Sequence, residues 1–254
     1  MNNEVGPHRL HGCAMAALRT WILGSTVALA GGLPATAAEP RSPIAPAAST
    51  APAKPKPLID CVDEKHREIV AGIMKSPTIS AKASDEEFVA HPNVYEWLIA
   101  HPDRTTKAWQ RLKVPSVDIT DLGKGQFFWS DETGSELTWQ TVGRFEHGVI
   151  WYATGKVKPA ALMPTVPVKA VAVLHSPRGA QDKDTGNATF KPTVQVYLLA
   201  DSRVAAGLVK MMGPSAPKMA EEGAEQFLFF FSGIARYIAR KPDQLEPLLA
   251  PAKK

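Results

Sequence analysis

A long amphipathic segment near the C-terminus, residues 215–241, constrains the fold of this chain more than any other feature. Ser215 is a favourable N-cap, and Pro217 is tolerated in the first turn because its missing N–H has no helical partner there. Glutamates occupy the N-terminal half and basic residues the last turns, a polarity that complements the helix dipole. The segment predicts one helix of about 25 residues and roughly 37 Å, long enough to cross a domain.

One side of this predicted helix is apolar and requires burial. Residues spaced by three and four positions form a single stripe: Met219, Gly223, Phe227, Phe230, Ile234 and Ile238. Within it, residues 227–231 are apolar on every side, yet the run is far shorter than the roughly 20 apolar residues that span a bilayer. We expect a core helix beneath a sheet. The alternatives are a helix that lines a cavity for an apolar ligand, and a helix that contacts a membrane surface or a partner.

The N-terminal region has the pattern of a secretory signal peptide. An apolar run at residues 21–33 is followed by the small-residue motif Ala35-Thr36-Ala37. We therefore predict a signal peptide over residues 1–38, with cleavage near Ala37 or Ala38, and an exported protein that is periplasmic or extracellular. Because Met15 begins a more compact signal peptide, we also expect translation to start there rather than at Met1.

Residues 39–58 form a different kind of segment, with six prolines in twenty residues. Proline fixes φ and removes a backbone donor, so this stretch predicts an extended tether rather than a helix or a central strand. The remaining residues, 59–250, have the length and composition of a single domain.

Charge and cysteine content exclude several classes of function. The chain has a formal charge of +4, and removal of residues 1–38, with two arginines and one glutamate, lowers it to +3. This charge is too small to indicate nucleic-acid binding. Cys61 would be the one cysteine left after cleavage, which excludes an internal disulfide, and its acidic neighbours Asp60 and Asp63 disfavour a reactive thiolate.

The middle of the chain predicts an antiparallel sheet. Segments rich in β-branched and aromatic residues are separated by short turns, so consecutive strands pair as antiparallel neighbours. The predicted strands are 126–130, 136–145, 149–158, 166–175 and 193–200. Helical patterns precede them at 60–76, from Ser84 onward, at 92–100 and from a cap at Asp103, and a short helix is expected at 202–212. The pattern predicts the α+β class, with a meander of about five to six strands, N-terminal helices and a long C-terminal helix packed across the sheet.

Motifs for phosphate binding, nucleophilic serine chemistry and zinc-dependent hydrolysis are missing from the sequence. Two His-Pro pairs, His91-Pro92 and His101-Pro102, could hold a metal together with Asp85 or Asp103. Turns that begin helices explain the pairs more simply. We expect no metal, no cofactor and no catalytic residue.

The aromatic side chains of the predicted sheet and final helix are the best candidates for a ligand pocket, since such pockets are mostly apolar with a few polar groups. A solid core is the alternative interpretation. The candidate ligand-binding residues are Trp129, Trp139, Phe145, Trp151, Tyr152, Tyr197, Phe227 and Phe230, with Arg144, His147 and His175 as polar groups.

The order of the predicted elements resembles a known family. PNVYEWLIAHPDRTTKAWQRL followed by VDIT is similar to the helical opening of START-like, polyketide-cyclase-like helix-grip proteins. TVQVYLLAD and SAPKMAEEGAEQFLFFFSGIARYIARK resemble their last strand and gripping helix. The resemblance covers roughly residues 84–241 and implies a cavity for lipid-like or aromatic small molecules, often without catalysis.

These observations lead to one hypothesis and two alternatives. The hypothesis is an exported, non-catalytic binding protein for an apolar, lipid-like small molecule, with possible peripheral membrane contact and no nucleic-acid partner. The first alternative is a hydrolase or cyclase on the same scaffold that uses His147 or His175 as its base. The second is a structural or interaction protein with a solid core.

Overall fold

The computed structural model describes residues 57–158, 165–200 and 216–250. The predicted signal peptide, nearly all of the proline-rich tether, the predicted helix at 202–212 and the predicted N-cap Ser215 lie outside these ranges.

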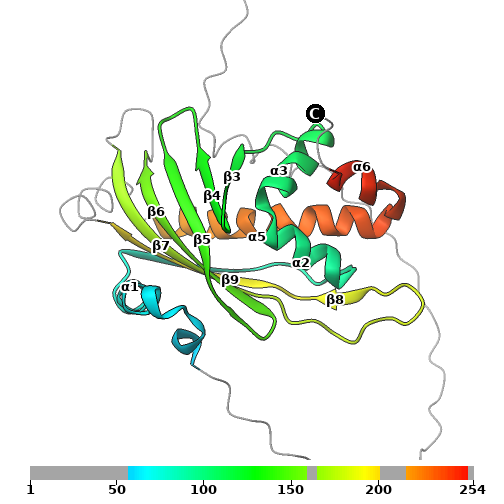
Figure 1. Ribbon diagram of the computed structural model, residues 1–254, viewed down its shortest axis with the longest axis horizontal. Helices are drawn as coiled ribbons and strands as arrows, with labels where there is room; N and C mark the ends of the chain where they lie inside the picture. Colours follow the sequence, from blue (N-terminus) through cyan, green and yellow to red (C-terminus); the bar gives the residue numbers. More distant parts are fainter. Residues whose placement is uncertain (1–56, 159–164, 201–215, 251–254) are drawn as a thin grey trace, which may run out of the picture.

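The centre of the fold is a seven-stranded sheet with strand order β1-β9-β7-β6-β5-β4-β3 (Figure 1). Every neighbouring pair in it is antiparallel. A second, two-stranded sheet pairs β2 with β8. The strands are β1 Ile79–Ser84, β2 Phe88–Ala90, β3 Ile119–Gly123, β4 Gln126–Ser130, β5 Glu136–Phe145, β6 Gly148–Val157, β7 Val166–His175, β8 Ala188–Phe190 and β9 Thr193–Ala200.

Helices cover both faces of the large sheet. The long helix α5 crosses one face, here called the inner face, and α1 lies against the other, here called the outer face (Figure 1). The predicted α+β class and the long C-terminal helix on the sheet are confirmed, although the sheet has more strands than expected. The helical segments are η2 Leu58–Cys61, α1 Glu64–Lys75, α2 Pro92–Ala100, α3 Pro102–Arg111, α5 Ala216–Arg240, η4 Pro242–Gln244 and α6 Leu245–Leu249.

The larger hydrophobic core lies between α5 and the inner face. Leu228, Phe231 and Ile234 on α5 are almost completely buried. They share a helical face because each is three residues from the next. This face packs against inner-face side chains that include Trp151 and Leu174. Burial of each such side chain contributes about 1.5–3 kcal/mol, so the α5–sheet contact is a major source of stability.

A smaller core lies between α1 and the outer face. Val70 and Ile73 of α1 pack there with outer-face valines and Ile150. The segment before α1 is held close to the sheet by a β-bridge between Val62 and Gly143. A side chain at position 143 would place its Cβ 2.5 Å from the Cys61 carbonyl oxygen, so glycine permits this close approach.

The prediction of a helix from Ser84 is wrong. Residues 79–84 form strand β1, in which Ala81 and Ala83 are buried and the alternate residues are exposed. The carboxylate of Asp85 pairs with Arg236 on α5, at 2.7 Å. Strand pairing with β9 and this ion pair therefore override the local helix signal.

Smaller differences concern element ends and short strands. Helix α3 begins at Pro102 with His101 as its N-cap, so Asp103 lies in the first turn rather than at the cap. Strand β6 is shifted by one residue from its predicted bounds. The short strands β2, β3 and β8 were not predicted from the sequence.

Candidate functional site

The predicted pocket residues do not form one cluster, because they lie on both faces of the sheet. Cross-strand partners share a face, and Trp151 pairs with Thr141 and Ala172 on the inner face. Trp129, Trp139, Trp151, Phe227 and Phe230 belong to the inner face and to α5, whereas Phe145, Tyr152, Tyr197 and His175 belong to the outer face. Arg144 and His147 are exposed beside the β5–β6 turn.

Beneath the middle of α5, aromatic rings fill the inner face. The ring centre of Trp151 lies 5.4 Å from that of Phe227 and 6.2 Å from that of Phe231. Phe231 also contacts Phe230, with 4.9 Å between ring centres. Trp151 and Phe231 are buried, so this part of the interface is packed like a core.

Toward β4 and β5, the inner face is less completely covered. Trp129, Leu137 and Trp139 are only half-buried there. Trp139 lies beside Ala153 and Leu137 beside Gly155, so small residues line the adjoining strand. This combination of large, half-buried side chains and small neighbours leaves apolar surface accessible.

Helix α5 has an open position on the stripe that carries Phe227. Gly223 lies one turn before Phe227 on the same helical stripe and is half-buried. A Cβ added at Gly223 would meet no atom within 4 Å. There is therefore room for additional apolar atoms beside the ring of Phe227.

One polar group on the inner face lacks a partner. The indole N–H of Trp129 is buried without a hydrogen-bond acceptor in the described part of the chain. The indole N–H of Trp109, by contrast, donates to the Phe230 carbonyl oxygen at 2.9 Å. A buried donor without an acceptor is costly, so the Trp129 N–H marks a place where an oxygen atom would be favourable.

The outer face carries a groove that the sequence analysis missed. A cavity of about 550 Å³ lies between α1 and strands β6, β7 and β9. A smaller hollow of about 100 Å³ adjoins it near Gln140 and Tyr152. The spacing of the α1 residues was a usable signal, because they recur at helical intervals along one side. The groove is lined by Lys65, His66, Glu68, Ile69, Gly72 and Ile73 from α1 and by Tyr152, Lys169 and Leu199 from the sheet.

Burial affects the tyrosine hydroxyls of this face. It raises the pKa of Tyr152 and of Tyr197 above the ordinary value near 10. Both hydroxyls are therefore neutral at physiological pH, and each is able to donate a hydrogen bond.

The two histidines proposed as bases do not have the environment of a general base. His147 and His175 are both exposed. His147 Nε2 lies 3.6 Å from a carboxylate oxygen of Glu146, but that glutamate side chain is itself 90% exposed. His175 stacks on Phe145 with 5.8 Å between ring centres. A cleft that holds base and partner together is therefore missing at both positions.

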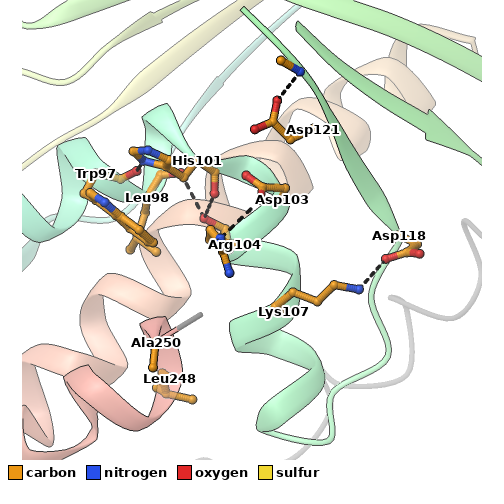
Figure 2. A network of polar contacts seen from close by, with 12 residues as sticks. Trp97, Leu98, His101, Asp103, Arg104, Lys107, Asp118, Asp121, Leu248 and Ala250 are labelled. Carbon is orange, nitrogen blue, oxygen red and sulfur yellow. Dashed lines mark hydrogen bonds and ion pairs between the residues drawn. The ribbon is translucent and has the colours of Figure 1, made fainter. Parts of the chain in front are cut away.

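The His-Pro pairs begin helices, which confirms the turn interpretation. His91 and His101 directly precede α2 and α3, and each proline occupies the start of its helix. His101 Nδ1 lies 2.9 Å from the Trp97 carbonyl oxygen, and its ring stacks on that of Trp97 (Figure 2). Figure 2 also shows the Lys107–Asp118 ion pair, at 2.9 Å, which ties α3 to the segment before β3. Within the described ranges, no group of three or more potential ligands with metal-binding geometry is found.

Comparisons with known proteins show only distant similarity. No family model and no curated protein sequence match the chain. A solved structure of a conserved protein from Geobacillus kaustophilus is 12% identical with a TM-score of 0.39, covering 64% of this chain and 96% of that one.

Two similar structures have named functions. Truncated norcoclaurine synthase from Thalictrum flavum is 11% identical with a TM-score of 0.30, covering 59% of this chain and 94% of that one. The di-domain ARO/CYC BexL from the BE-7585A biosynthetic pathway is 15% identical with a TM-score of 0.32, covering 72% of this chain and 54% of that one.

The element order in the structure, a strand and two helices before the meander and a long helix after it, is consistent with a helix-grip fold. None of the described helices has both the length and the apolar character needed to span a membrane.

Proposed function

We propose that this protein is an exported, non-catalytic binding protein for an apolar, lipid-like small molecule. The ligand would lie on the inner face, between strands β4–β6 and the N-terminal half of α5. The observation that carries the proposal is the gap at Gly223, where an added Cβ would meet no atom within 4 Å although the residue lies on the half-buried side of the helix.

The chemistry of this region supports an apolar ligand with few polar atoms. Trp129, Leu137 and Trp139 offer half-buried apolar surface. Covering such surface is favourable by about 25 cal/mol per Å². The unpartnered N–H of Trp129 favours one acceptor oxygen on the ligand, such as a hydroxyl, ester or carboxylate oxygen. Export and peripheral membrane contact are parts of the proposal that rest on the signal-peptide pattern and the apolar ligand.

The test uses the inner-face tryptophans as reporters. Stearic acid brominated at mid-chain quenches tryptophan fluorescence on contact, and Trp129, Trp139 and Trp151 lie on the proposed binding face. We expect saturable quenching of the full mature chain. Gly223→Leu should weaken it about tenfold or more, which corresponds to about 1.4 kcal/mol, because leucine would occupy the gap beside Phe227.

A matched control separates blocking from a general effect of replacing a helical glycine. Gly72→Leu makes the same substitution on α1, on the other side of the sheet, where an added Cβ likewise meets no atom within 4 Å. It should leave the quenching of the inner-face tryptophans unchanged. Absence of quenching in the wild-type chain, or equal quenching in Gly223→Leu, would support a solid core and overturn the proposal.

A further inference from the structure

The groove between α1 and the outer face has the dimensions of a small-molecule site. Its volume of about 550 Å³ lies within the range of roughly 300–1,000 Å³ that is typical of ligand pockets. Its floor is apolar, with Ile69 and Ile73 on the helix side and Leu199 on β9. The groove lies on the opposite side of the sheet from the inner face, so the two regions do not overlap.

A glycine borders the open space. Gly72 lies on the same side of α1 as Ile69 and Ile73, three residues from the first and next to the second. A Cβ added at Gly72 would meet no atom within 4 Å. Glycine inside a helix is destabilising relative to alanine, so α1 carries a cost in stability at the position where a longer side chain would fill the groove.

Positive charge flanks the apolar floor from two sides. Lys65 comes from α1 and Lys169 from β7, and both line the groove. Neither forms an ion pair within the described ranges, whereas Lys107 and Lys156 pair with carboxylates at 2.9 and 3.2 Å. Glu68 is the acidic residue of the lining, so the lining has a net positive charge that favours an anion.

Hydrogen-bonded polar side chains border one side of the groove. Gln126 Nε2 donates to Gln140 Oε1 at 3.1 Å, so the Gln140 amide nitrogen donates to His66 Nε2 at 2.7 Å. This direction assigns the proton of neutral His66 to Nδ1. That Nδ1 is buried without an acceptor among the described residues. The ring of Tyr152 lies 5.8 Å from that of His66.

From these four features we propose that the outer-face groove is a second ligand site. It would bind a small amphipathic anion, with the apolar body on Ile69, Ile73 and Leu199 and the anionic group between Lys65 and Lys169. The Nδ1–H of His66 has no acceptor in the part of the chain that the structure describes, and an oxygen of the anionic group would supply one. The site is independent of the inner-face proposal, because it uses other residues on the other side of the sheet.

The experiment is a titration of the isotope-labelled mature chain with sodium laurate, followed by amide chemical shifts. We expect saturable shifts of α1 amides, with Gly72 among them, and a binding curve distinct from that of α5 amides. Gly72→Leu should abolish the α1 shifts without lowering the melting temperature, because leucine has the higher helix propensity. Gly223→Leu, the matched control, should leave the α1 shifts unchanged.

The charge requirement is tested separately, with a variant that does not alter the helix backbone. Lys65→Gln combined with Lys169→Gln should weaken laurate binding at α1 about 3- to 10-fold, as expected for the loss of two partly exposed charge contacts. Binding of uncharged dodecanol should not change in that variant.

Each contrary outcome overturns a stated part of the second-site proposal. If laurate shifts no α1 amide, or shifts them equally in Gly72→Leu, the groove is not a ligand site. If the doubly neutral variant binds laurate as well as the wild type, an anionic ligand is excluded. The inner-face proposal is tested by different readouts. It fails if the wild-type chain shows no ligand-induced shifts of α5 amides and no quenching of tryptophan fluorescence.

Discussion

Loss of the Arg236 guanidinium is expected to destabilise the attachment of α5 to the sheet edge. Arg236 Nη2 lies 2.7 Å from Asp85 Oδ1 and donates to the Glu86 carbonyl oxygen at 2.9 Å. The guanidinium carbon also lies 4.9 Å from the centre of the Phe88 ring. The Arg236 and Asp85 side chains are only 22% and 13% exposed, so water replaces these contacts poorly.

The size of the effect follows from partial burial. Removing one partner of a fully buried ion pair costs about 3–5 kcal/mol, and residual exposure reduces that figure toward the surface value of at most about 1 kcal/mol. Loss of the cation–π contact adds about 0.5–1 kcal/mol. We therefore expect Arg236→Met, which keeps most of the apolar stem, to lower the free energy of unfolding by about 2–4 kcal/mol.

Equilibrium unfolding in urea measures this loss. With a slope of about 2 kcal/mol per M, the midpoint should fall by roughly 1–2 M. Asp85→Asn and the double variant complete a double-mutant cycle, and the two losses should not add, because both substitutions remove the same contact. A loss below about 1 kcal/mol, or strict additivity of the two substitutions, would refute the reasoning.

The remaining predictions concern the sheet, a turn and the N-terminus. Gly143→Ala should destabilise the protein by about 1–3 kcal/mol in thermal unfolding, since its Cβ would lie 2.5 Å from the Cys61 carbonyl oxygen. Burial acts to raise the pKa of Asp131, but hydrogen bonds from Thr133 and Ser135 outweigh it and hold that pKa below its ordinary value. Asp131→Ala should therefore lower the free energy of unfolding by about 1 kcal/mol at pH 7. This difference between the wild type and the variant should diminish below about pH 4 and vanish once the pH is below the lowered pKa of Asp131 in the folded state. N-terminal sequencing of the mature protein from the exported fraction should give a start near residue 38; an intact residue 1 or 15 would contradict cleavage.

The strongest local patterns predicted their elements well. Helix α5 and most long strands have nearly their predicted bounds, because the periodicity of their apolar residues agrees with the burial that the fold imposes. Strand β1 was missed for the opposite reason. Alanine, lysine and serine dominate it, and the acidic residues after Ser84 imitate a helix start, whereas pairing with β9, distant in sequence, determines the structure.

The candidate site was predicted less well, although part of the missing information was present in the sequence. Trp151 and Tyr152 are neighbours on one strand, so their side chains must point to opposite faces. Applying that alternation to the whole aromatic set would have separated inner-face from outer-face residues. The groove beneath α1 required knowledge of which face α1 covers, and this depends on the contact of Val62 with Gly143, about eighty residues apart in the chain.

The alternation of side chains on β6 has a further consequence for how this protein would respond to ligand binding. Trp151 belongs to the inner-face core and Tyr152 to the outer-face groove, so a single layer of backbone forms the partition between the two compartments. The strands are common to both sides, whereas α1 borders only the groove and α5 only the inner face. Thermodynamic linkage then requires reciprocity. If a ligand on the inner face changes the affinity of the groove for its ligand, the groove ligand changes the affinity of the inner face by the same factor. A ligand titration of either region should therefore be performed at a known occupancy of the other.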